Sequence, residues 1–230
     1  MPNRSARNRR AEFKRSVVTA VSTHLQPRLG LIDYGSGNLR SVTKALESVR
    51  SNIQRISNGP IPEDLDALVL PGVGSFGDSV NQLRQRRLFD AVRDWLEAGK
   101  PFLGICLGYQ LLFEHSEESP NVRGLGVLPG EVRRFAGPDL KVPQIGWNTV
   151  RWTALTRKRY PGLPADPYVY FVHSYYPVPV DSTVIAGMTD YGGPFASVIA
   201  TNTLLATQFH PEKSQAAGLQ ILKTFVASLP

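Results

Sequence analysis

Residues 102–110 have the sequence FLGICLGYQ, in which a short apolar strand leads through a Gly-x-Cys-x-Gly turn into a helix. This order is the nucleophile-elbow pattern, with Cys106 in the position of the nucleophile. Glycines at 104 and 108 suit a strained turn, in which a neighbouring Cβ would crowd the nucleophile. The pattern predicts that the Cys106 sulfur projects at the carboxyl end of the strand, where N–H groups of the following helix favour the thiolate.

Cys106 is the one cysteine of the chain, which excludes an internal disulfide. A lone cysteine is often a small buried core residue, and this is the competing interpretation. The two flanking glycines and the change from strand to helix at this point favour a nucleophile.

Strands and helices alternate around this elbow, which is typical of a parallel sheet with helices on both faces. Apolar runs predict strands at 29–33, 53–56, 67–70 and 101–105. Apolar residues at helical spacing predict helices at 39–49, at about 78–98 with an interruption allowed, and at 107–114.

The second half of the chain changes to short β segments that are broken by Gly and Pro. These predicted segments are 126–128, 132–135, 149–152, 168–172, 183–186, 197–200 and 204–208. We expect them to add antiparallel strands to the sheet edge, before a last helix at about 214–227. The predicted class is therefore α/β, a mostly parallel central sheet flanked by helices with antiparallel β additions.

Composition limits the class of protein. The 230 residues are 42% hydrophobic and 20% charged, which excludes a disordered or collagen-like chain and fits one compact domain. The sequence has no run of about 18 apolar residues, so no transmembrane helix is expected.

The net charge of +7 is concentrated at the N-terminus, because residues 1–26 carry six basic residues against one acidic residue. We expect a basic, disordered extension at 1–27 and a nearly neutral domain at 28–230. A solvated extension, or a start codon placed too early, is favoured over a transit peptide or an arm that binds nucleic acid.

A cysteine nucleophile needs a base, and His210 is the preferred candidate because Glu212 follows two residues later, after Pro211. In extended chain these two side chains face the same side, so the carboxylate can orient the imidazole and stabilise its charge. The competing interpretation is a capping glutamate beside a surface histidine.

Residues 71–77, PGVGSFG, follow another buried strand and contain three glycines. Such a segment allows a ligand to approach backbone N–H groups closely, as in an oxyanion hole or a phosphate cradle. A plain connecting turn is the competing interpretation, and the spacing fits neither a dinucleotide fingerprint nor a P-loop.

Together, PGVG at 71–74, the elbow at 104–110, HSY at 173–175 and QFHPEKS at 208–214 resemble a class I glutamine amidotransferase domain, which has a flavodoxin-like fold. A narrower resemblance is to the glutaminase subunits of imidazole glycerol phosphate synthase, from histidine biosynthesis. It is carried by DYGSGNL at 33–39, PGVGSFGD at 71–78, GWN at 146–148, YFVH at 170–173 and HPEKS at 210–214. The resemblance covers residues 28–229.

The resemblance implies a catalytic triad. Cys106 attacks the side-chain amide of glutamine, His210 acts as acid and base, and Glu212 orients His210. Ammonia leaves, and a glutamyl thioester is hydrolysed to glutamate. The backbone N–H groups of Val73 and Leu107 are the expected oxyanion donors.

The resemblance also implies residues that bind glutamine and residues that contact a partner. The substrate-binding positions are Gly74, Gln110, Glu118 and the backbone of Ser174 and Tyr175. The partner is a cyclase subunit, a (β/α)8 barrel that receives the ammonia within a heterodimer. The positions expected at this interface and at the ammonia exit are Asn38, Trp147, Asn148, Tyr170 and Lys213.

No cofactor, metal, nucleic acid or membrane is expected to take part, and the expected location is the cytoplasm. Three alternatives remain. The first is a glutaminase of another amidotransferase, of the anthranilate or aminodeoxychorismate synthase type, which HPEKS and PGVGSFGD disfavour. The second is a stand-alone cysteine hydrolase, for instance of γ-glutamyl peptides. The third is a protein without enzymatic activity whose basic arm binds nucleic acid, which the complete triad disfavours.

Overall fold

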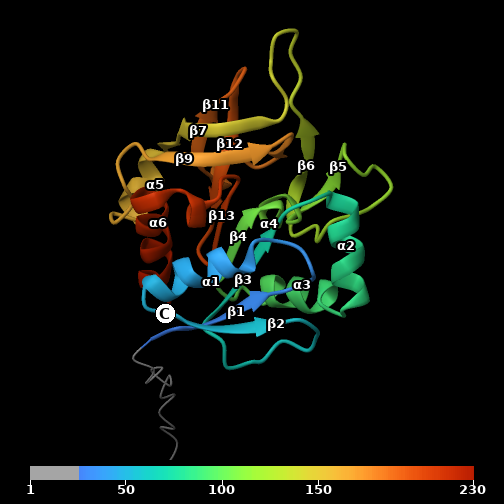
Figure 1. Ribbon diagram of the computed structural model, residues 1–230, viewed down its shortest axis with the longest axis vertical. Coiled ribbons are helices and arrows are strands. Elements are labelled where there is room, and N and C mark those ends of the chain that lie inside the picture. The colour runs from blue at the N-terminus through green and yellow to red at the C-terminus, as the bar shows by residue number, and fades with distance from the viewer. Residues whose placement is uncertain (1–25) are drawn as a thin grey trace, which may run out of the picture.

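The structure is a computed structural model and describes residues 26–230, so the predicted N-terminal extension lies almost wholly outside the described residues. Its centre is an eight-stranded sheet with the order β2-β1-β3-β4-β13-β12-β11-β8 (Figure 1). The parallel half of this sheet consists of β1 (Arg28–Ile32), β2 (Asn52–Ile56), β3 (Ala67–Gly72), β4 (Phe102–Cys106) and β13 (Leu204–Thr207). The predicted α/β class with a mostly parallel central sheet is confirmed.

Strands β3 and β4 are buried along their whole length, which explains why they were recognisable as continuous apolar runs. Side chains of a strand alternate between the two faces of the sheet, so Leu68 and Leu70 enter one core while Ala67 and Val69 enter the other. The first core lies under α2 (Phe76–Gln85) and α3 (Phe89–Glu97), and the second lies under α1 (Leu39–Ser48) and α6 (Gln215–Ala227). Figure 1 shows these two pairs of helices on opposite sides of the sheet.

The expected placement of the late strands is only partly right. β12 (Pro194–Ala200), β11 (Ile185–Asp190) and β8 (Arg151–Trp152) do extend the sheet edge as antiparallel strands. However, β13 is parallel to β4, and two groups of strands form sheets of their own. These groups are β5 (Phe113–Ser116), β6 (Leu128–Arg134) and β10 (Tyr175–Pro179), and the ribbon of β7 (Gln144–Thr149) with β9 (Tyr168–His173). An apolar pattern identifies a strand but does not name its pairing partner.

One helix prediction also needs correction. The helix expected at 107–114 ends at Gln110 as α4 (Leu107–Gln110), and Phe113–Ser116 pairs with β6 instead. The run from Leu111 to Phe113 is buried on every side, so its apolar residues suit a strand as well as a helix. The stretch expected at 78–98 contains the interruption that was allowed there, since α2 and α3 are separate helices and Arg87 between them has a positive φ of 55°. Helix α5 (Ala154–Arg159) and strand β10 were not predicted.

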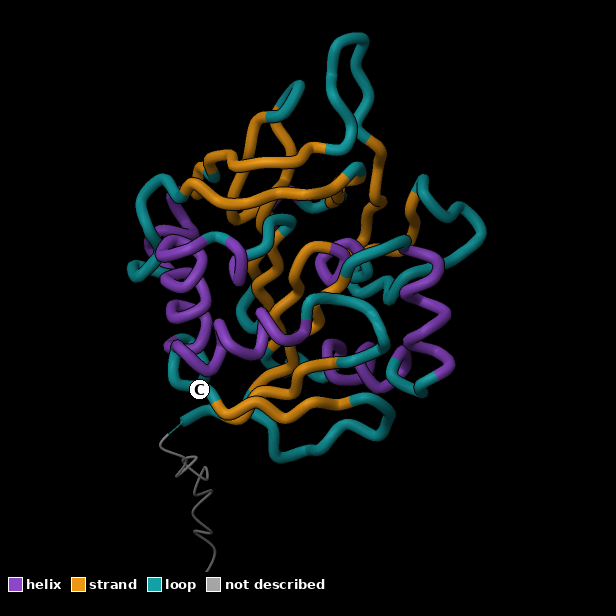
Figure 2. Tube along the Cα trace, viewed as in Figure 1, coloured by secondary structure: helices purple, strands orange, loops and turns teal. Residues whose placement is uncertain are grey.

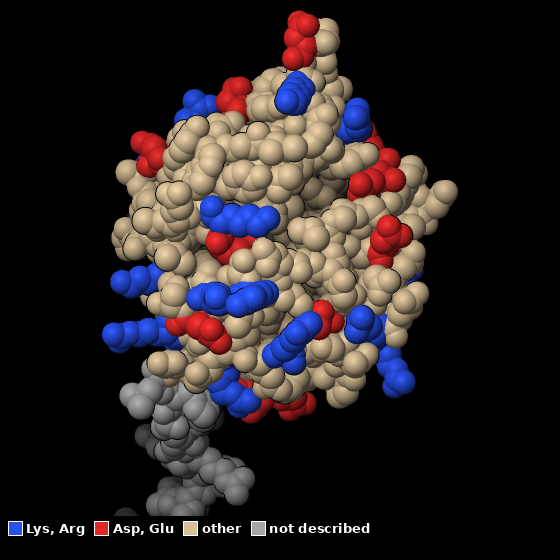
Figure 3. Space-filling model, in the orientation of Figure 1, with Lys and Arg blue, Asp and Glu red and all other residues tan. Residues whose placement is uncertain are grey.

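Charge is evenly mixed on the face drawn in Figure 3, where basic and acidic side chains are interspersed. Among residues 26–230, no helix has the length and apolar character needed to cross a membrane. In Figure 2 the β7–β9 ribbon crosses over the antiparallel end of the main sheet, and β7 contacts β11. This crossing brings the end of β9 over the carboxyl ends of the parallel strands, where the candidate site lies.

Candidate active site

A pocket of about 440 Å³ opens at the carboxyl ends of β3, β4 and β13. This is the edge at which open parallel sheets bind ligands. Ten expected site residues line it. Seven of them are Val73, Gly74, Cys106, Leu107, Gln110, Glu118 and His210. Ser174, Tyr175 and Lys213 also line the pocket, together with Pro143, Val172 and His173, which no prediction had placed there.

Cys106 ends β4 and has a positive φ of 54° with ψ at −107°, a strained conformation for a residue with a Cβ. Gly108 is required by its close contact with β3, whereas Gly104 packs tightly both against β13 and against the backbone of Gly108 in the elbow itself. A Cβ on Gly108 would lie 1.8 Å from the carbonyl oxygen of Leu70, and one on Gly104 would lie 3.1 Å from the Cβ of Ala206. In the elbow, α4 therefore packs closely against β3, and the strained backbone conformation of the turn is that of Cys106.

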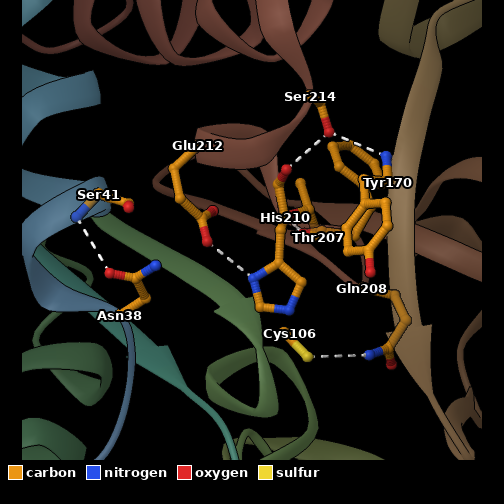
Figure 4. A network of polar contacts seen from close by, with 10 residues as sticks. Asn38, Ser41, Cys106, Tyr170, Thr207, Gln208, His210, Glu212 and Ser214 are labelled. Atoms are coloured by element: carbon orange, nitrogen blue, oxygen red, sulfur yellow. Dashed lines mark hydrogen bonds and ion pairs between the residues drawn. The ribbon is translucent and has the colours of Figure 1, made fainter. Parts of the chain in front are cut away.

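His210 and Glu212 form the contact that the sequence predicted. His210 Nδ1 lies 2.8 Å from Glu212 Oε1, and both side chains are almost completely buried. The local backbone differs from the expected extended chain, because Pro211–Lys213 form a 3₁₀ turn that begins directly after His210. Ser214 secures this turn, since its hydroxyl donates to the His210 carbonyl at 2.6 Å (Figure 4).

The charge state of His210 follows from its neighbours. Burial alone would lower the pKa of His210, but the facing Cys106 and the bonded Glu212 together raise that pKa to about 10. In Figure 4 the imidazole lies over the Cys106 sulfur, with Nδ1 directed to Glu212. The arrangement therefore holds an imidazolium beside the sulfur at neutral pH, as a thiolate nucleophile requires.

His173 lies at the same pocket but has the opposite character. Burial lowers its pKa to about 4, even though Nδ1 bonds the carbonyl oxygen of Tyr175 at 2.8 Å. Nε2 lies 3.0 Å from the side-chain amide of Gln144. His173 is therefore neutral at pH 7 and holds a backbone carbonyl in place, which leaves His210 as the residue able to transfer protons.

The segment 71–74 forms one wall of the pocket. Gly72 pairs in register with Cys106, so Val73 and Gly74 continue the chain beside the nucleophile. Gly72 has no room for a side chain, because a Cβ there would lie 2.3 Å from the hydroxyl of Tyr34. Gly74 has a positive φ of 99°, and the Val73 carbonyl accepts a hydrogen bond from the Ser36 hydroxyl.

Glu118 lines the pocket and also makes a hydrogen bond that stabilises the fold. Its Oε2 accepts a hydrogen bond from the backbone N–H of Phe76 at 2.7 Å, which satisfies a free donor at the start of α2. Glu118 is half-buried, unlike the solvated acidic neighbour Glu117. One carboxylate oxygen is thus committed to the fold, and the other is available to the pocket.

Gln208 is a residue of this site that sequence reasoning missed. Its Nε2 donates to the Cys106 sulfur at 3.7 Å, and its Oε1 accepts from Gln110 Nε2 at 3.1 Å. The side chain is completely buried. The signal available was a polar residue shortly after the apolar run 204–206, because such a residue must find partners when the strand is buried.

The five positions expected at a partner interface have three different surroundings. Trp147 of β7 packs against Tyr170 of β9 with ring centroids 6.0 Å apart, and Lys213 Nζ lies 5.9 Å from the centre of the Tyr170 ring. Asn38 instead caps α1, which packs beside the Pro211–Lys213 turn, by accepting from the Ser41 N–H at 3.3 Å. The fifth, Asn148, donates to the Asp190 carbonyl at 2.8 Å and so ties β7 to β11.

Within residues 26–230, no group of three or more His, Cys, Asp and Glu side chains is placed to hold a metal ion. The pocket instead gathers a buried thiol, a charged imidazole with its carboxylate, and backbone N–H groups. This set is suited to acyl transfer from an amide or ester, with a thioester as the intermediate.

Comparisons with known proteins agree with this chemistry. Residues 30–229 match the family "Glutamine amidotransferase class-I". The imidazole glycerol phosphate synthase subunit HisH of Aquifex aeolicus is 49% identical over 199 residues, covering 86% of this chain and 95% of the relative. The protein of the same name from Microcystis aeruginosa is 47% identical over 201 residues, covering 86% and 94%.

Solved structures support the fold at lower identity. The structure of PurLQS from Thermotoga maritima superposes with a TM-score of 0.70 at 18% identity, covering 89% of this chain and 97% of that one. A crystal structure of a glutamine amidotransferase superposes with a TM-score of 0.67 at 20% identity, covering 87% and 97%. The chain belongs to the class I glutamine amidotransferases, in the family of the HisH subunits of imidazole glycerol phosphate synthase.

Proposed function

We propose that this chain is the glutaminase subunit of an imidazole glycerol phosphate synthase and hydrolyses the side-chain amide of glutamine with the triad Cys106, His210 and Glu212. The observation that carries this proposal is one pocket in which a cysteine at a strained elbow faces an imidazole bonded to a carboxylate at 2.8 Å. Ammonia is the product passed on to histidine biosynthesis, and glutamate is released.

The proposed reaction has two halves. The Cys106 thiolate adds to the amide carbon, and the His210 imidazolium gives its proton to the departing nitrogen, so that ammonia leaves and a glutamyl thioester remains. Water then attacks the thioester while His210 takes its proton, and cleavage of the carbon–sulfur bond returns the thiolate and glutamate. Glu212 stabilises the charged imidazole in both halves, in agreement with the raised pKa of His210.

We propose the backbone N–H groups of Leu107 and Val73 as the oxyanion donors. Leu107 is the first residue of α4, where an N–H group has no partner within the helix. Val73 lies on the opposite wall of the pocket, one residue beyond the Gly72–Cys106 pair. The loss of one such donor costs roughly 10²–10³ in kcat in other enzymes.

Glutamine itself would be held by Gly74, Gln110, Glu118, Ser174 and Tyr175. The free carboxylate oxygen of Glu118 suits the ammonium group of the substrate. Phe135 N–H donates to the Ser174 carbonyl at 3.0 Å, so Phe135 and Ser174 are a hydrogen-bonded pair of this antiparallel ladder. Bonded and non-bonded pairs alternate, and the next pair, Arg134 with Tyr175, therefore exchanges no backbone hydrogen bonds. The N–H of Tyr175 therefore points away from β6, on the same side as its carbonyl, and suits the substrate carboxylate.

We propose that a cyclase subunit, a (β/α)8 barrel, docks over the β7–β9 ribbon and receives the ammonia. Free ammonia would become ammonium in water at neutral pH and lose its nucleophilicity, so it must be transferred within a complex. Trp147, Tyr168 and Ile145 are large exposed side chains on this ribbon, and exposed aromatic residues often anchor interfaces. Tyr170 packs against Trp147, and Lys213 lies over the Tyr170 ring, so both extend this face. Asn148 is directed to β11 on the other face of the ribbon, and Asn38 is proposed at the border of the interface.

We also propose the bounds of the domain and the location of the protein. Residues 28–230 are proposed as one amidotransferase domain, with residues 1–27 as an extension that takes no part in catalysis. The cytoplasm is proposed as the location, because the mechanism needs Cys106 as a free thiol and that compartment keeps thiols reduced.

The test compares glutamine hydrolysis by the chain alone, with a cyclase partner, and with the partner and its ligand. Cys106→Ala should abolish hydrolysis of glutamine, while the complex that contains it should still cyclise when ammonia is supplied. Hydrolysis that persists in Cys106→Ala would refute the triad. A full rate in the isolated wild-type chain would instead favour a stand-alone hydrolase.

A further inference from the structure

We propose that Gln208 is a hydrogen-bond donor to the nucleophile, held in its donating orientation by the Tyr175 carbonyl acting through Gln110. The inference rests on the proposed role of Cys106 and adds a residue to that site. Gln208 Nε2 lies 3.7 Å from the Cys106 sulfur, within hydrogen-bonding range of a sulfur acceptor. Figure 4 shows this amide and the His210 imidazole both close to the sulfur.

The orientation of the Gln208 amide follows from a series of hydrogen bonds that begins at a backbone carbonyl, which can only accept. A carbonyl oxygen can only accept, so the atom of Gln110 that lies 2.9 Å from the Tyr175 oxygen must be its Nε2. The same Nε2 lies 3.1 Å from the Gln208 amide, so the Gln208 atom that faces it must be Oε1. The remaining Gln208 atom, Nε2, then has to face Cys106.

The anchor of this series is itself fixed. The Tyr175 carbonyl points away from the β6 ladder and also bonds His173 Nδ1 at 2.8 Å. Gln110 and Gln208 are both buried, so neither amide can exchange these partners for bulk water. Rotation of the Gln208 amide would place two N–H donors, Gln208 Nε2 and Gln110 Nε2, against one another at one end and an oxygen against the sulfur at the other. Such unsatisfied buried groups are costly, and the donating orientation is therefore imposed.

The contact has a specific consequence for the nucleophile. An N–H donor favours negative charge on sulfur, whereas a carbonyl oxygen in the same place would oppose it. With the His210 imidazolium on one side and the Gln208 amide on another, the sulfur is also held in one position above the elbow. Gln208 thus supports the thiolate and restricts its direction of attack.

Alkylation by iodoacetamide tests the contact, because Cys106 is the only cysteine and its modification is read directly by mass. Two variants of the full-length chain remove the donor. Gln208→Met keeps the volume, and Gln208→Glu keeps the shape and an acceptor for Gln110 while turning a carboxylate oxygen to the sulfur. We expect the alkylation rate at pH 7 to fall about tenfold or more in both variants, since hydrogen bonds to charged groups are worth about 1.5–3 kcal/mol. The profile of rate against pH should move to higher pH.

The other titratable groups near the sulfur stay in place in these variants. They are His210 with Glu212 behind it, His173 beside His210, and the buried phenol of Tyr34. Glu118, Tyr175 and Lys213 line the same pocket and are likewise unchanged in these variants. Thr207→Val is the matched control, because Thr207 is equally buried and its hydroxyl bonds the Phe209 carbonyl instead of Cys106. This control should lose stability but keep the wild-type alkylation profile. Wild-type profiles in both folded Gln208 variants would overturn the proposal.

A second measurement does not depend on the folding of Gln208 variants. In the chain labelled with [¹⁵N]glutamine, the side-chain amide protons of Gln208 should shift when Cys106 is replaced by alanine at constant pH. Unchanged Gln208 resonances would show that no bond to sulfur exists and would refute the proposal. If Cys106→Ala abolishes glutamine hydrolysis while Gln208 variants alkylate normally, this inference fails and the proposed function stands. If Cys106→Ala remains active, the proposed function fails.

Discussion

His210, beyond β13, and His173, at the end of β9, line the same pocket and are both buried, yet the structure gives them opposite charge states. The pKa of His210 is raised to about 10, because Cys106 and Glu212 outweigh the effect of burial. The pKa of His173 is lowered to about 4, because burial outweighs its bond to a neutral carbonyl, and the neighbouring His210 charge adds to the lowering. The side chains that face each ring therefore decide which of two buried histidines is charged, and burial alone does not.

The largest difference between the two histidines is expected when each imidazole ring is replaced. His210→Gln should reduce kcat/KM for glutamine by roughly 10⁴–10⁶, as loss of the base does in other triads. His173→Gln should act on KM more than on kcat, because His173 holds the Tyr175 segment and touches no reacting atom. Steady-state kinetics of both variants, with the partner present, measure the contrast. Equal losses of kcat in the two folded variants would contradict the division of roles.

Removal of the anionic partner alone should have a smaller effect. Glu212→Gln can still bond Nδ1 of His210 but cannot stabilise its charge, so we expect kcat to fall by roughly 10²–10⁴. The pKa of His210, followed by NMR, should decrease in the same variant. A kcat as low as that of His210→Gln, with the fold intact, would show that Glu212 does more than orient and stabilise the imidazole.

The two histidines should also have opposite effects on how the unfolding free energy depends on pH. For His210 the folded-state pKa lies above the ordinary 6.5, so its stabilising contribution is complete below pH 6.5 and is lost as the pH rises through about 10. For His173 the folded-state pKa is lower than in the unfolded chain, so stability decreases as the pH falls from 6.5 to about 4.

Urea unfolding between pH 4 and pH 7 checks the His173 contribution. His173→Gln should be less stable than wild type at pH 7, and its unfolding free energy should depend less on pH over this range. Between pH 7 and pH 4 the unfolding free energy of wild type should decrease by up to about 3 kcal/mol more than that of His173→Gln. Parallel pH profiles for the two proteins would mean that His173 does not titrate with a lowered pKa.

The smallest effect is expected far from both histidines. Deletion of residues 1–26 should leave glutamine hydrolysis unchanged and shift the melting temperature by no more than a few degrees, because this segment has no sustained apolar periodicity. Calorimetry and the glutaminase assay measure both quantities. A larger drop in melting temperature would show that the segment packs on the domain.

Much of the site could be predicted from the sequence because its motifs lie within short segments of the chain. The elbow at 102–110 and the His210–Glu212 pair each lie within one short segment, so spacing alone places their side chains. The buried strands β3 and β4 were recognisable for the same reason, as unbroken apolar runs between Gly- and Pro-containing turns. Prediction failed where two distant segments compete, as at 107–114, which ends as a strand because β6 supplies a partner.

The sequence by itself determined the strands and helices of the α/β core, the elbow at Cys106 and the His210–Glu212 pair, since each depends on residues a few positions apart. Only the tertiary structure decided the functions of Gln208 and His173. Their roles are set by Cys106, Gln110 and Tyr175, which lie on other strands and helices. The physical reason is that a buried polar side chain takes its orientation and charge from the groups that surround it in space. The chain brings those groups together only when β4, β9 and β13 meet at one pocket.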